Sequence, residues 1–344
     1  MTGPRAGLRV GLVGYGDAGR GIHAPLLARA GLAVTAVQTR DPGRVAAVRA
    51  ELPDAAVVPT LGRLLDRDLD LVVLASPSGV HAEQALACVA AGVPVVVDKP
   101  LATDAATARS VSDAAAAAGV PLTVFQNRRW DGEHLTLRRL LAEGALGEVF
   151  RLERRWERWR PEPKDRWREN AAPADGGGLL LDLQSHLVDA AVQLLGPVTS
   201  VYAELAARTT PAEDDAFLAC THAGGARSHL GALSLAAAPG PRTRVLGTRA
   251  AYVATSFEAE PTAFAALADL DGAHTGWLVT GDQRTPVRRE PGHHADFYAA
   301  VAGALRGGAG QAGMPVQPAE AVHVLQVLDA ARVSDAARRV VRLD

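Results

Sequence analysis

Three glycines near the N-terminus have the spacing of a nucleotide-binding turn. Gly14, Gly16 and Gly19 form the pattern G-x-G-x-x-G, between an apolar run and a helical stretch. In this setting the glycines allow a tight turn and a close approach of the backbone to a pyrophosphate, and the amides at the helix start attract phosphate charge. The pattern predicts a dinucleotide site that also includes Asp17 and Ala18.

The residues that follow the second predicted strand bear on which dinucleotide binds. NAD-selecting versions of this turn have an acid about 20 positions further on, which holds the ribose 2′-hydroxyl, whereas an Arg accommodates a 2′-phosphate. Thr39 stands at that position and Arg40 follows it. Because a hydroxyl and a guanidinium suit a phosphate dianion, the pair favours NADP(H) over NAD(H). Asp41 has two interpretations: its carboxylate binds a ribose hydroxyl of the cofactor, or it caps the helix that starts near Pro42.

Lysine is nearly absent from the chain. Of the 36 basic side chains only Lys99 and Lys164 are lysines. Lys99 lies between a predicted buried strand and Pro100, where an Arg would be larger and would not release a proton. We therefore expect Lys99 to have a chemical function, and Lys164 to face solvent.

The elements that must position these residues alternate through the first third of the chain. Short β-branched runs are predicted strands, at 8–13, 32–37, 71–75, 94–97 and 122–125. Helical stretches separate them, at 21–30, 44–51, 61–66, 80–91 and 104–118. This alternation is typical of a doubly wound parallel sheet, so the sequence predicts an N-terminal Rossmann domain at 1–123.

Beyond residue 126 the predicted strands follow one another with short connections, at 149–155, 198–206, 216–221, 229–236, 243–247 and 250–255. Helices are predicted at 134–143, 179–195, 295–305 and 318–339. The whole chain is therefore predicted to be α/β, with a C-terminal α+β domain at 124–344 that contains an open, mainly antiparallel sheet. An uncovered apolar sheet face must be buried, so we expect a homodimer or homotetramer through this sheet.

Several motifs together resemble one family. Residues 75–81 read ASPSGVH, 98–100 read DKP, and 176–189 read GGGLLLDLQSHLVD. With the glycine turn they resemble the Gfo/Idh/MocA oxidoreductases, named for glucose-fructose oxidoreductase and inositol dehydrogenase. Asp98 replaces the family's usual Glu, and Gln184 replaces a usual Gly. The resemblance covers essentially the full length and implies cofactor contacts from Ser76, Pro77, His81, Asp98 and Lys99.

Further motifs narrow the resemblance. Residues 127–131 read NRRWD, 159–162 WRPE, 166–169 RWRE and 240–242 GPR, similar to the NADP-dependent scyllo-inositol dehydrogenase-like members. This similarity implies NADP(H) as cofactor and a cyclic polyol or sugar as substrate. The implied substrate contacts are Asn127, Arg129, Trp130, Trp167, Asp182 and His186.

Hydride transfer from a secondary alcohol to nicotinamide needs a group that takes the hydroxyl proton and a cation that stabilises the alkoxide. The resemblance implies Lys99, Asp182 and His186 for these roles. Asp182 and His186 are four residues apart, on one face of a helix. His186 is the predicted proton donor and acceptor, because an unperturbed imidazole has a pKa of about 6.5. Asp182 would orient the substrate, Lys99 would bridge its hydroxyl and the cofactor, and which of the three is the formal base stays open.

Composition excludes several other classes of protein. The net charge is −2, and the Arg/Trp-rich stretch at 151–168 is interleaved with acids, which argues against nucleic acid as a partner. That stretch suits either substrate contacts or a packing arm. Cys88 and Cys220 lie far apart, and His293 and His294 have no partners at metal-ligand spacing, so we expect no disulfide framework and no metal.

The lead at 1–7 lacks the features of a targeting segment, and no run approaches the length that spans a bilayer. We therefore expect a cytoplasmic protein without membrane contact. The predicted function is an NADP(H)-dependent oxidoreductase that acts on the CH–OH group of a cyclic polyol or sugar. The alternatives are an NAD(P)-dependent reductase of a non-carbohydrate specialised metabolite and a non-catalytic nucleotide-binding regulator.

Overall fold

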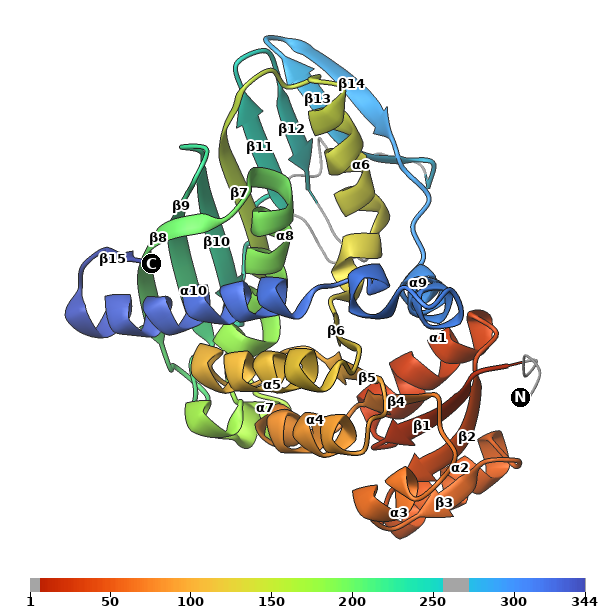
Figure 1. The fold of residues 1–344 in the computed structure, drawn as a ribbon. Coiled ribbons are helices and arrows are strands. Elements are labelled where there is room, and N and C mark those ends of the chain that lie inside the picture. The colour runs from red at the N-terminus through yellow and green to blue at the C-terminus, as the bar shows by residue number, and fades with distance from the viewer. Residues whose placement is uncertain (1–6, 256–271, 344) are drawn as a thin grey trace. The chain divides into compact units, whose positions relative to one another are not determined.

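The structure, a computed structural model, describes residues 7–255 and 272–343, apart from the side chain of Arg168. The chain forms two compact units, here called unit 1 (Met1–Asn127 and His293–Val322) and unit 2 (Arg128–Gly292 and His323–Asp344). Unit 1 contains a parallel sheet and unit 2 a mainly antiparallel one (Figure 1), which confirms the predicted fold class. The predicted N-terminal lead lies almost entirely outside the described residues.

Unit 1 is built on six parallel strands in the order β3-β2-β1-β4-β5-β6. The order reverses between β1 and β4, and open α/β sheets bind ligands beyond the carboxyl ends of the strands at such a point. β4 reads LVVL and is buried at every position, as expected for a parallel sheet covered on both faces. The strands are β1 (Arg9–Val13), β2 (Ala33–Gln38), β3 (Ala56–Val58), β4 (Leu71–Leu74), β5 (Val95–Asp98) and β6 (Leu122–Phe125).

Local side chains fix where the helices of unit 1 begin and end. Asp41 and Asp104 each accept a hydrogen bond at 2.8 Å from the backbone amide three residues on, and Gly119, with a φ of 65°, ends α5. Helices α4 and α5 pack on each other, and α4 packs on β4 and β5 (Figure 1). The helices are α1 (Ala24–Arg29), α2 (Pro42–Glu51), α3 (Leu61–Leu65), α4 (His81–Ala90), α5 (Ala105–Ala118) and α9 (Ala295–Arg306), with short turns η1 (Gly19–His23), η2 (Ser78–Val80) and η7 (Gly310–Gly313). The turn η3 (Asn127–Trp130) begins in unit 1 and continues in unit 2.

Two elements of unit 1 differ from the sequence prediction. The strand β3 was not predicted, because three residues are too few for a periodic pattern to appear. The helix after the glycine turn begins at Gly19 rather than at residue 21, and its first turn, η1, is π-helical.

Unit 1 also contains residues far along the chain. Helix α9 packs against α1, and the Thr123 hydroxyl donates to the carbonyl oxygen of Val316 at 2.8 Å. The Gln311 amide both accepts from and donates to the backbone of Leu122, 189 residues away in sequence. The predicted division at residue 123 keeps this segment in the second domain, since no local pattern shows such distant pairing.

Unit 2 is built on a nine-stranded sheet in the order β14-β13-β12-β11-β7-β10-β9-β8-β15. Its pairings are antiparallel except that β7 and β10 run parallel. The edge strand β14 reads QRTPVR and is largely exposed, and it was not predicted because its residues are polar and include Pro286. The strand β15 was not predicted because it has only two residues. The strands are β7 (Val149–Glu157), β8 (Val198–Ala206), β9 (Asp215–His222), β10 (Arg227–Leu233), β11 (Thr243–Gly247), β12 (Ala251–Ala254), β13 (His274–Thr280), β14 (Gln283–Arg288) and β15 (Val341–Arg342).

Helices cover one face of this sheet. Helix α8 packs on β7 and β10 and contacts α6 (Figure 1). Burial alternates along β9, where Ala216, Leu218 and Cys220 are buried and the residues between them are half-buried. The helical elements are α6 (Gly132–Ala142), α7 (Trp167–Asn170), η4 (Pro173–Asp175), η5 (Leu180–Gln184), α8 (Ser185–Leu195) and α10 (Pro318–Ala337), which begins in unit 1 and continues in unit 2.

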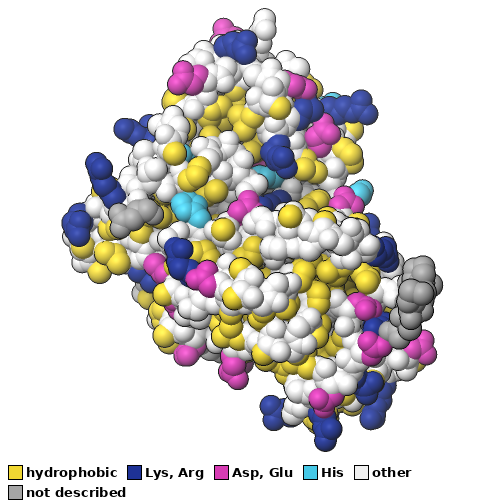
Figure 2. Space-filling view, in the orientation of Figure 1, with side chains coloured by type: hydrophobic (Ala, Val, Ile, Leu, Met, Phe, Trp, Pro, Cys, Tyr) yellow, Lys and Arg dark blue, Asp and Glu magenta, His cyan; other side chains and the backbone are white. Residues whose placement is uncertain are grey.

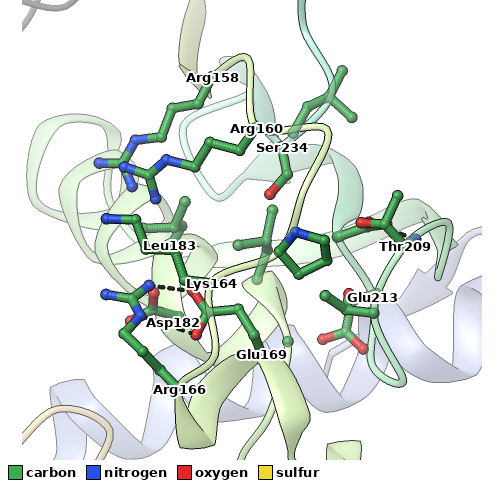
Figure 3. A pocket seen from close by; sticks show the side chains of 16 residues that line it. Arg158, Arg160, Lys164, Arg166, Glu169, Asp182, Leu183, Thr209, Glu213 and Ser234 are labelled. Carbon is green, nitrogen blue, oxygen red and sulfur yellow. Dashed lines mark hydrogen bonds and ion pairs between the residues drawn. The ribbon is translucent and has the colours of Figure 1, made fainter.

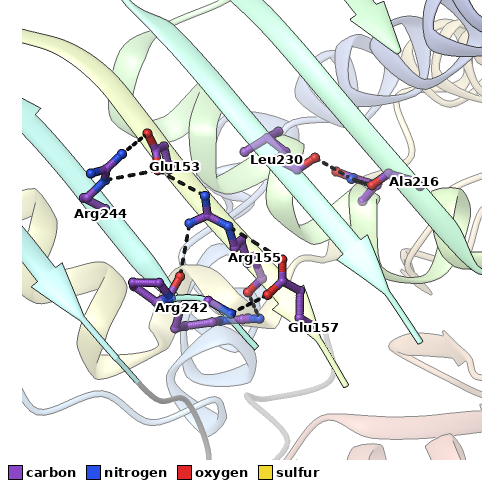
Figure 4. Close-up of polar contacts among 10 residues, drawn as sticks. Glu153, Arg155, Glu157, Ala216, Leu230, Arg242 and Arg244 are labelled. Carbon is purple, nitrogen blue, oxygen red and sulfur yellow. Dashed lines mark hydrogen bonds and ion pairs between the residues drawn. The ribbon is translucent and has the colours of Figure 1, made fainter. Parts of the chain in front are cut away.

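The other face of the sheet carries charged side chains as well as apolar ones. Glu153 on β7 pairs with Arg155 and with Arg244 on β11, and Arg155 also pairs with Glu157 (Figure 4). Burial alone would raise the pKa of Glu153, but Arg244 and Arg155 outweigh it and hold that pKa below its usual value. Ion pairs thus let charged side chains share this face of the sheet with apolar ones.

Charged side chains of both signs are interspersed on the face drawn in Figure 2, in keeping with the net charge of −2. Among the described helices, none combines the length and hydropathy that crossing a bilayer requires.

Candidate functional site

The glycine turn after β1 leaves no room for side chains at two of its glycines. Gly14 has a φ of 89°, and a Cβ there would lie 2.8 Å from the carbonyl oxygen of Ala75. A Cβ on Gly19 would overlap the carbonyl oxygen of Gly14. At Gly16 a Cβ would lie 3.6 Å from the guanidinium of Arg44. The turn thus presents bare backbone, which fits a pyrophosphate.

The rest of the turn adds a helix start without a side-chain cap and a tether to α2. Asp17 is exposed, and Ala18 at the helix start has no side-chain oxygen to cap the first amides. The Tyr15 hydroxyl donates to Glu51 at the end of α2 at 3.0 Å, and Arg20 pairs with the same carboxylate. The turn is therefore held against α2 without covering its amides.

The segment after β2 lies beside this turn. Thr39 is buried and its amide donates to the carbonyl oxygen of Val58 at 3.1 Å, whereas Arg40 is exposed. The Asp41 carboxylate accepts the Arg44 amide at 2.8 Å and caps α2. Of the two interpretations of Asp41, the structure shows the helix cap. The sequence analysis missed Arg44, whose guanidinium faces Gly16 from the first turn of α2.

His81 joins two loops at the carboxyl ends of β4 and β5. Its ring nitrogens lie 2.8 Å from the carbonyl oxygens of Ser76 and Pro100. Burial lowers the pKa of His81, which favours a neutral ring that donates to one carbonyl at a time. The Ser76 hydroxyl donates to Gln84 at 2.6 Å, and Pro77 is exposed. The loops after β4 and β5, which contain the residues predicted to contact the cofactor, are therefore held together by the His81 ring.

Lys99 follows β5 and is 9% exposed. Its amide donates to the Asp98 carboxylate at 2.8 Å, and the other Asp98 oxygen lies 3.6 Å from Nε2 of His23. The Tyr298 hydroxyl lies 2.5 Å from Nδ1 of His23. Burial alone would raise the pKa of Asp98, but the His23 ring and the Lys99 ammonium outweigh it and hold that pKa well below its usual value. Asp98 thus stays ionised beside Lys99.

His23 and Tyr298 are positioning residues that the sequence analysis missed. Both are fully buried, and both rings pack against Phe125, with centroids 4.6 and 5.5 Å away. His23 follows the glycine turn by one helical turn, a spacing that carries a signal only once β5 is known to lie beside it. Tyr298 comes from α9, so no local pattern links it to Lys99.

In unit 2, Asp182 lies in the π-helical turn η5 and His186 lies in the first turn of α8. The predicted continuous helix thus changes its hydrogen-bonding pattern between them. The buried Gln184 amide donates to the carbonyl oxygens of Ala216 and Leu230, at 2.8 and 3.0 Å. Gln184, at the position where the family usually has Gly, therefore ties this turn to β9 and β10.

His186 lies beside a tryptophan surrounded by guanidinium groups. The ring centroids of His186 and Trp156 are 5.9 Å apart. Arg128, Arg158 and Arg242 each place a guanidinium carbon 4.4 to 5.0 Å from the centre of the Trp156 ring. Cation–π contacts of this kind hold the indole in place, so Trp156 supports the position of the His186 ring.

The other predicted substrate residues lie in varied surroundings. The buried Arg129 guanidinium makes two hydrogen bonds to Asp189, at 2.6 and 2.9 Å. The Asn127 side chain lies 3.2 Å from Nδ1 of His294. Trp130 and Trp167 are half-buried. The structure thus assigns Arg129 an ion pair within unit 2, and its contact with substrate stays a prediction.

A pocket that is partly open to solvent lies in unit 2, and Asp182 is one of the residues that line it (Figure 3). Lys164 is exposed, as expected, but it also lines this pocket. The charged lining residues are Arg158, Arg160, Lys164, Arg166, Glu169, Asp182, Glu213 and Asp214. The apolar and hydroxyl lining includes Leu179, Leu183, Leu233, Thr209, Thr210 and Ser234.

The predicted site residues are therefore divided between the units. The glycine turn, the Thr39 segment, the His81 loops and Lys99 lie in unit 1, whereas Asp182 and His186 lie in unit 2. In the described part of the chain, no group of three or more His, Cys, Asp or Glu side chains is arranged to hold a metal ion.

Comparison with known proteins places this geometry in context. Residues 8–126 match the oxidoreductase family with an NAD-binding Rossmann fold, and 134–253 match the GFO/IDH/MocA C-terminal domain. The chain is 35% identical to the oxidoreductase YdgJ of Escherichia coli, over 94% of each chain. It is 32% identical to scyllo-inositol 2-dehydrogenase (NADP(+)) IolW of Bacillus subtilis, over 98% of this chain and 96% of that one. The structure of the oxidoreductase YvaA of Bacillus subtilis superposes with a TM-score of 0.87, at 28% identity over 99% of this chain and 100% of that one.

Proposed function

Because the chain belongs to the Gfo/Idh/MocA oxidoreductase family, we propose that it is an NADP(H)-dependent dehydrogenase of a cyclic polyol or sugar. The family membership confirms the resemblance found in the sequence motifs. The chain is an NAD(P)-dependent oxidoreductase, and its relative IolW is named as a dehydrogenase of scyllo-inositol. The proposal adds the choice of NADP(H), the polyol and the roles of individual residues. It assigns nucleotide binding to 1–123, and substrate binding and oligomerisation to 124–344.

The position of Arg44 carries the proposed preference for NADP(H). Its guanidinium lies over Gly16, and Arg40 is exposed at the end of β2. The nearby Asp41 carboxylate is engaged as a helix cap and Thr39 stands at the position of the usual acid, so neither opposes a 2′-phosphate. Two guanidinium groups beside the turn suit that dianion. The name of IolW, an NADP(+) enzyme, supports the same choice.

The test compares both cofactors in the same variants. We expect Arg44→Ala and Arg40→Ala to lower kcat/KM for NADP+ about 10- to 100-fold, since a charge-assisted hydrogen bond contributes about 1.5–3 kcal/mol. The value for NAD+ should change less than about threefold. Arg49→Ala, an exposed residue in the last turn of α2, is the matched control. Equal values for the two cofactors in the wild type would contradict the proposed preference.

A nicotinamide cofactor bound at the glycine turn would supply the hydride acceptor or donor for the carbon that bears the substrate hydroxyl. His186 takes the hydroxyl proton during oxidation and returns it during reduction. The Lys99 ammonium would contact both the hydroxyl and the cofactor; its positive charge would lower the pKa of that hydroxyl and stabilise the alkoxide. Asp182 accepts a hydrogen bond from a neighbouring substrate hydroxyl and fixes its orientation.

The substrate class is tested by a screen of inositols, aldoses and their keto forms with NADP+ and NADPH. We expect turnover of at least one of these compounds, since the lining of the unit 2 pocket combines hydroxyl, carboxylate and guanidinium groups that pair with a polyol. Turnover confined to compounds without a polyol ring would contradict the proposal. The same preparation shows the oligomeric state by light scattering, where we expect a homodimer or homotetramer through the unit 2 sheet; a monomer at micromolar concentration would rule that out.

A further inference from the structure

The basic side of the unit 2 pocket comes from one continuous segment that follows β7. Backbone hydrogen bonds hold this segment to the end of β10, from Arg158 to Leu233 at 2.8 Å and from Arg160 to Ser234 at 2.7 Å. Side chains two residues apart in an extended chain point to the same side. Arg158 and Arg160 accordingly project together, and Lys164 extends toward the same space (Figure 3). We call these three side chains the cationic wall.

The wall is partly fixed in advance of ligand binding. The Arg158 guanidinium carbon lies 5.0 Å from the centre of the buried Trp156 ring, a contact that restrains a long side chain. The backbone of Arg158 is held from both sides, since its carbonyl oxygen also accepts the Ala236 amide at 2.8 Å. A ligand that binds here therefore orders fewer side-chain torsions, which favours affinity.

Three of the four acids that line the pocket have partners outside the wall. Asp214 accepts hydrogen bonds from the amides of Arg208 and Thr209 and from the Thr209 hydroxyl. Glu169 pairs with Arg166. Glu213 accepts the amide of Leu180 at 3.2 Å, and burial raises its pKa. Each of these three carboxylates is therefore held by a hydrogen bond or an ion pair from outside the cationic wall.

The fourth acid lies where the reaction is proposed. Asp182, on η5, belongs to the same lining as the wall, and Ser234 adds a hydroxyl to that lining (Figure 3). Because Asp182 and the wall line the same pocket, a ligand with one hydroxyl at Asp182 would present its other substituents to the wall. Arginine forks and a lysine ammonium match a carboxylate or a phosphate better than a neutral hydroxyl.

We propose that the cationic wall of Arg158, Arg160 and Lys164 binds the carboxylate or phosphate of the substrate, which is therefore an anionic sugar or cyclitol. This inference rests on the proposed polyol dehydrogenase function and names the substrate class within it. The shared chemistry is an anionic group attached to a polyol ring, and a carboxylate and a phosphate are the two sources that the experiment separates.

The experiment uses matched substrates with the NADP+-loaded enzyme. The pairs are glucose with glucuronate, glucose with glucose 6-phosphate, and myo-inositol with myo-inositol 1-phosphate. We expect kcat/KM for the anionic member to exceed that for the neutral member at least about tenfold, mainly through a lower KM, because a hydrogen bond between charged groups outweighs a neutral one. The better of the carboxylate and phosphate members identifies the anion.

Substitutions in the cationic wall test whether its side chains cause the preference for the anionic substrate. Arg160→Gln and Lys164→Gln should each lower the ratio of anionic to neutral kcat/KM about tenfold. The matched control is Arg284→Gln, an exposed residue of β14 in the same unit, which should keep the wild-type ratio. A wild-type ratio near one, or a ratio that the wall variants leave unchanged, would overturn the proposal.

A binding measurement keeps the two proposals distinguishable if no compound in the panel reacts. Calorimetric titration of glucuronate and myo-inositol 1-phosphate into the NADP+-loaded protein then tests the wall directly. Binding that Arg160→Gln and Lys164→Gln abolish supports the anion site while the proposed reaction fails. If neither compound binds, the anion site is wrong.

Discussion

The two units offer their ligands different kinds of groups. Unit 1 presents backbone: the turn at Gly14 and Gly19 excludes side chains, and His81 ties two loops through their carbonyl oxygens. Unit 2 presents long charged side chains, which converge on one pocket from separate segments of the chain. A site built from backbone therefore tolerates almost no added side-chain volume. In a site built from side chains, by contrast, a single charge substitution changes which ligand binds.

The largest effect should come from the residue that departs from this pattern, Lys99 in unit 1. We expect Lys99→Met to lower kcat about 10²- to 10⁴-fold, because the proposed bridge to the substrate hydroxyl is lost. The dissociation constant for NADP+ should change less than about threefold, since the glycine turn, Arg40 and Arg44 are proposed to hold the nucleotide. Steady-state kinetics and a fluorescence titration measure the two quantities. If Lys99→Met lowered the affinity for NADP+ as much as it lowered kcat, Lys99 would act in nucleotide binding and the contrast between the two units would fail.

Adding one methyl group to the backbone-built site should be nearly as damaging. We expect Gly19→Ala to destabilise unit 1 by about 3 kcal/mol and to weaken NADP+ binding, because its Cβ would overlap the carbonyl oxygen of Gly14. Gly21→Ala, in the same helical turn with no atom within 4 Å of its Cβ, is the matched control. Urea unfolding and cofactor titration should separate the two variants; equal behaviour would contradict the steric argument.

The positive charge in unit 2 should make the free energy of unfolding decrease at acidic pH. His134 is buried on α6 among Arg154, Arg138 and Arg129; burial first, and then these guanidinium groups, lower its pKa to about 3. In the unfolded chain the His134 imidazole has a pKa of about 6.5, so between about pH 3 and 6.5 the unfolded state binds more protons than the folded state. The contribution of His134 to the free energy of unfolding is therefore complete above about pH 7.5 and falls as the pH falls. Lowering the pH from 7.5 to 5 should cost about 2 kcal/mol through His134.

Urea unfolding at both pH values measures this cost. His134→Leu should lose about 2 kcal/mol less than the wild type over the same interval, whereas the exposed His293→Leu should behave as the wild type does. An identical pH dependence in His134→Leu would show that the acid sensitivity arises elsewhere.

The smallest effect compares one buried tyrosine in each unit. Tyr298→Phe leaves Nδ1 of His23 without the hydroxyl 2.5 Å away, which should cost about 1–2 kcal/mol. Because His23 faces Asp98, and Asp98 holds the Lys99 amide, turnover should also fall about two- to threefold. Tyr252→Phe in unit 2, which loses a hydrogen bond to Thr275, should cost a similar stability and leave turnover unchanged. Thermal melts and kinetics at saturating cofactor provide both readouts.

The contrast between the units also explains what the sequence could reveal. A backbone-built turn requires glycines at fixed spacing, so Gly14, Gly16 and Gly19 are visible in the sequence, as are most strands of unit 1. The pocket of unit 2 depends on side chains from segments as distant as Arg160 and Thr209. No spacing encodes such a convergence, and the contact of Tyr298 with His23 was hidden for the same reason. The strand β14 was missed because its exposed positions are polar.

The segment His293–Val322 has a consequence for how the protein is made. A ribosome adds about 5–20 residues each second, so roughly 10–40 s pass between the emergence of β6 and that of the residues that pair with it. Through this interval the nucleotide-binding sheet lacks Tyr298, Gln311 and Val316, which complete its buried hydrogen bonds. Unit 2 is synthesised almost entirely in the meantime. Nascent chains should therefore acquire cofactor affinity only near the end of translation, and a ribosome stalled before α9 should hold an incomplete nucleotide site.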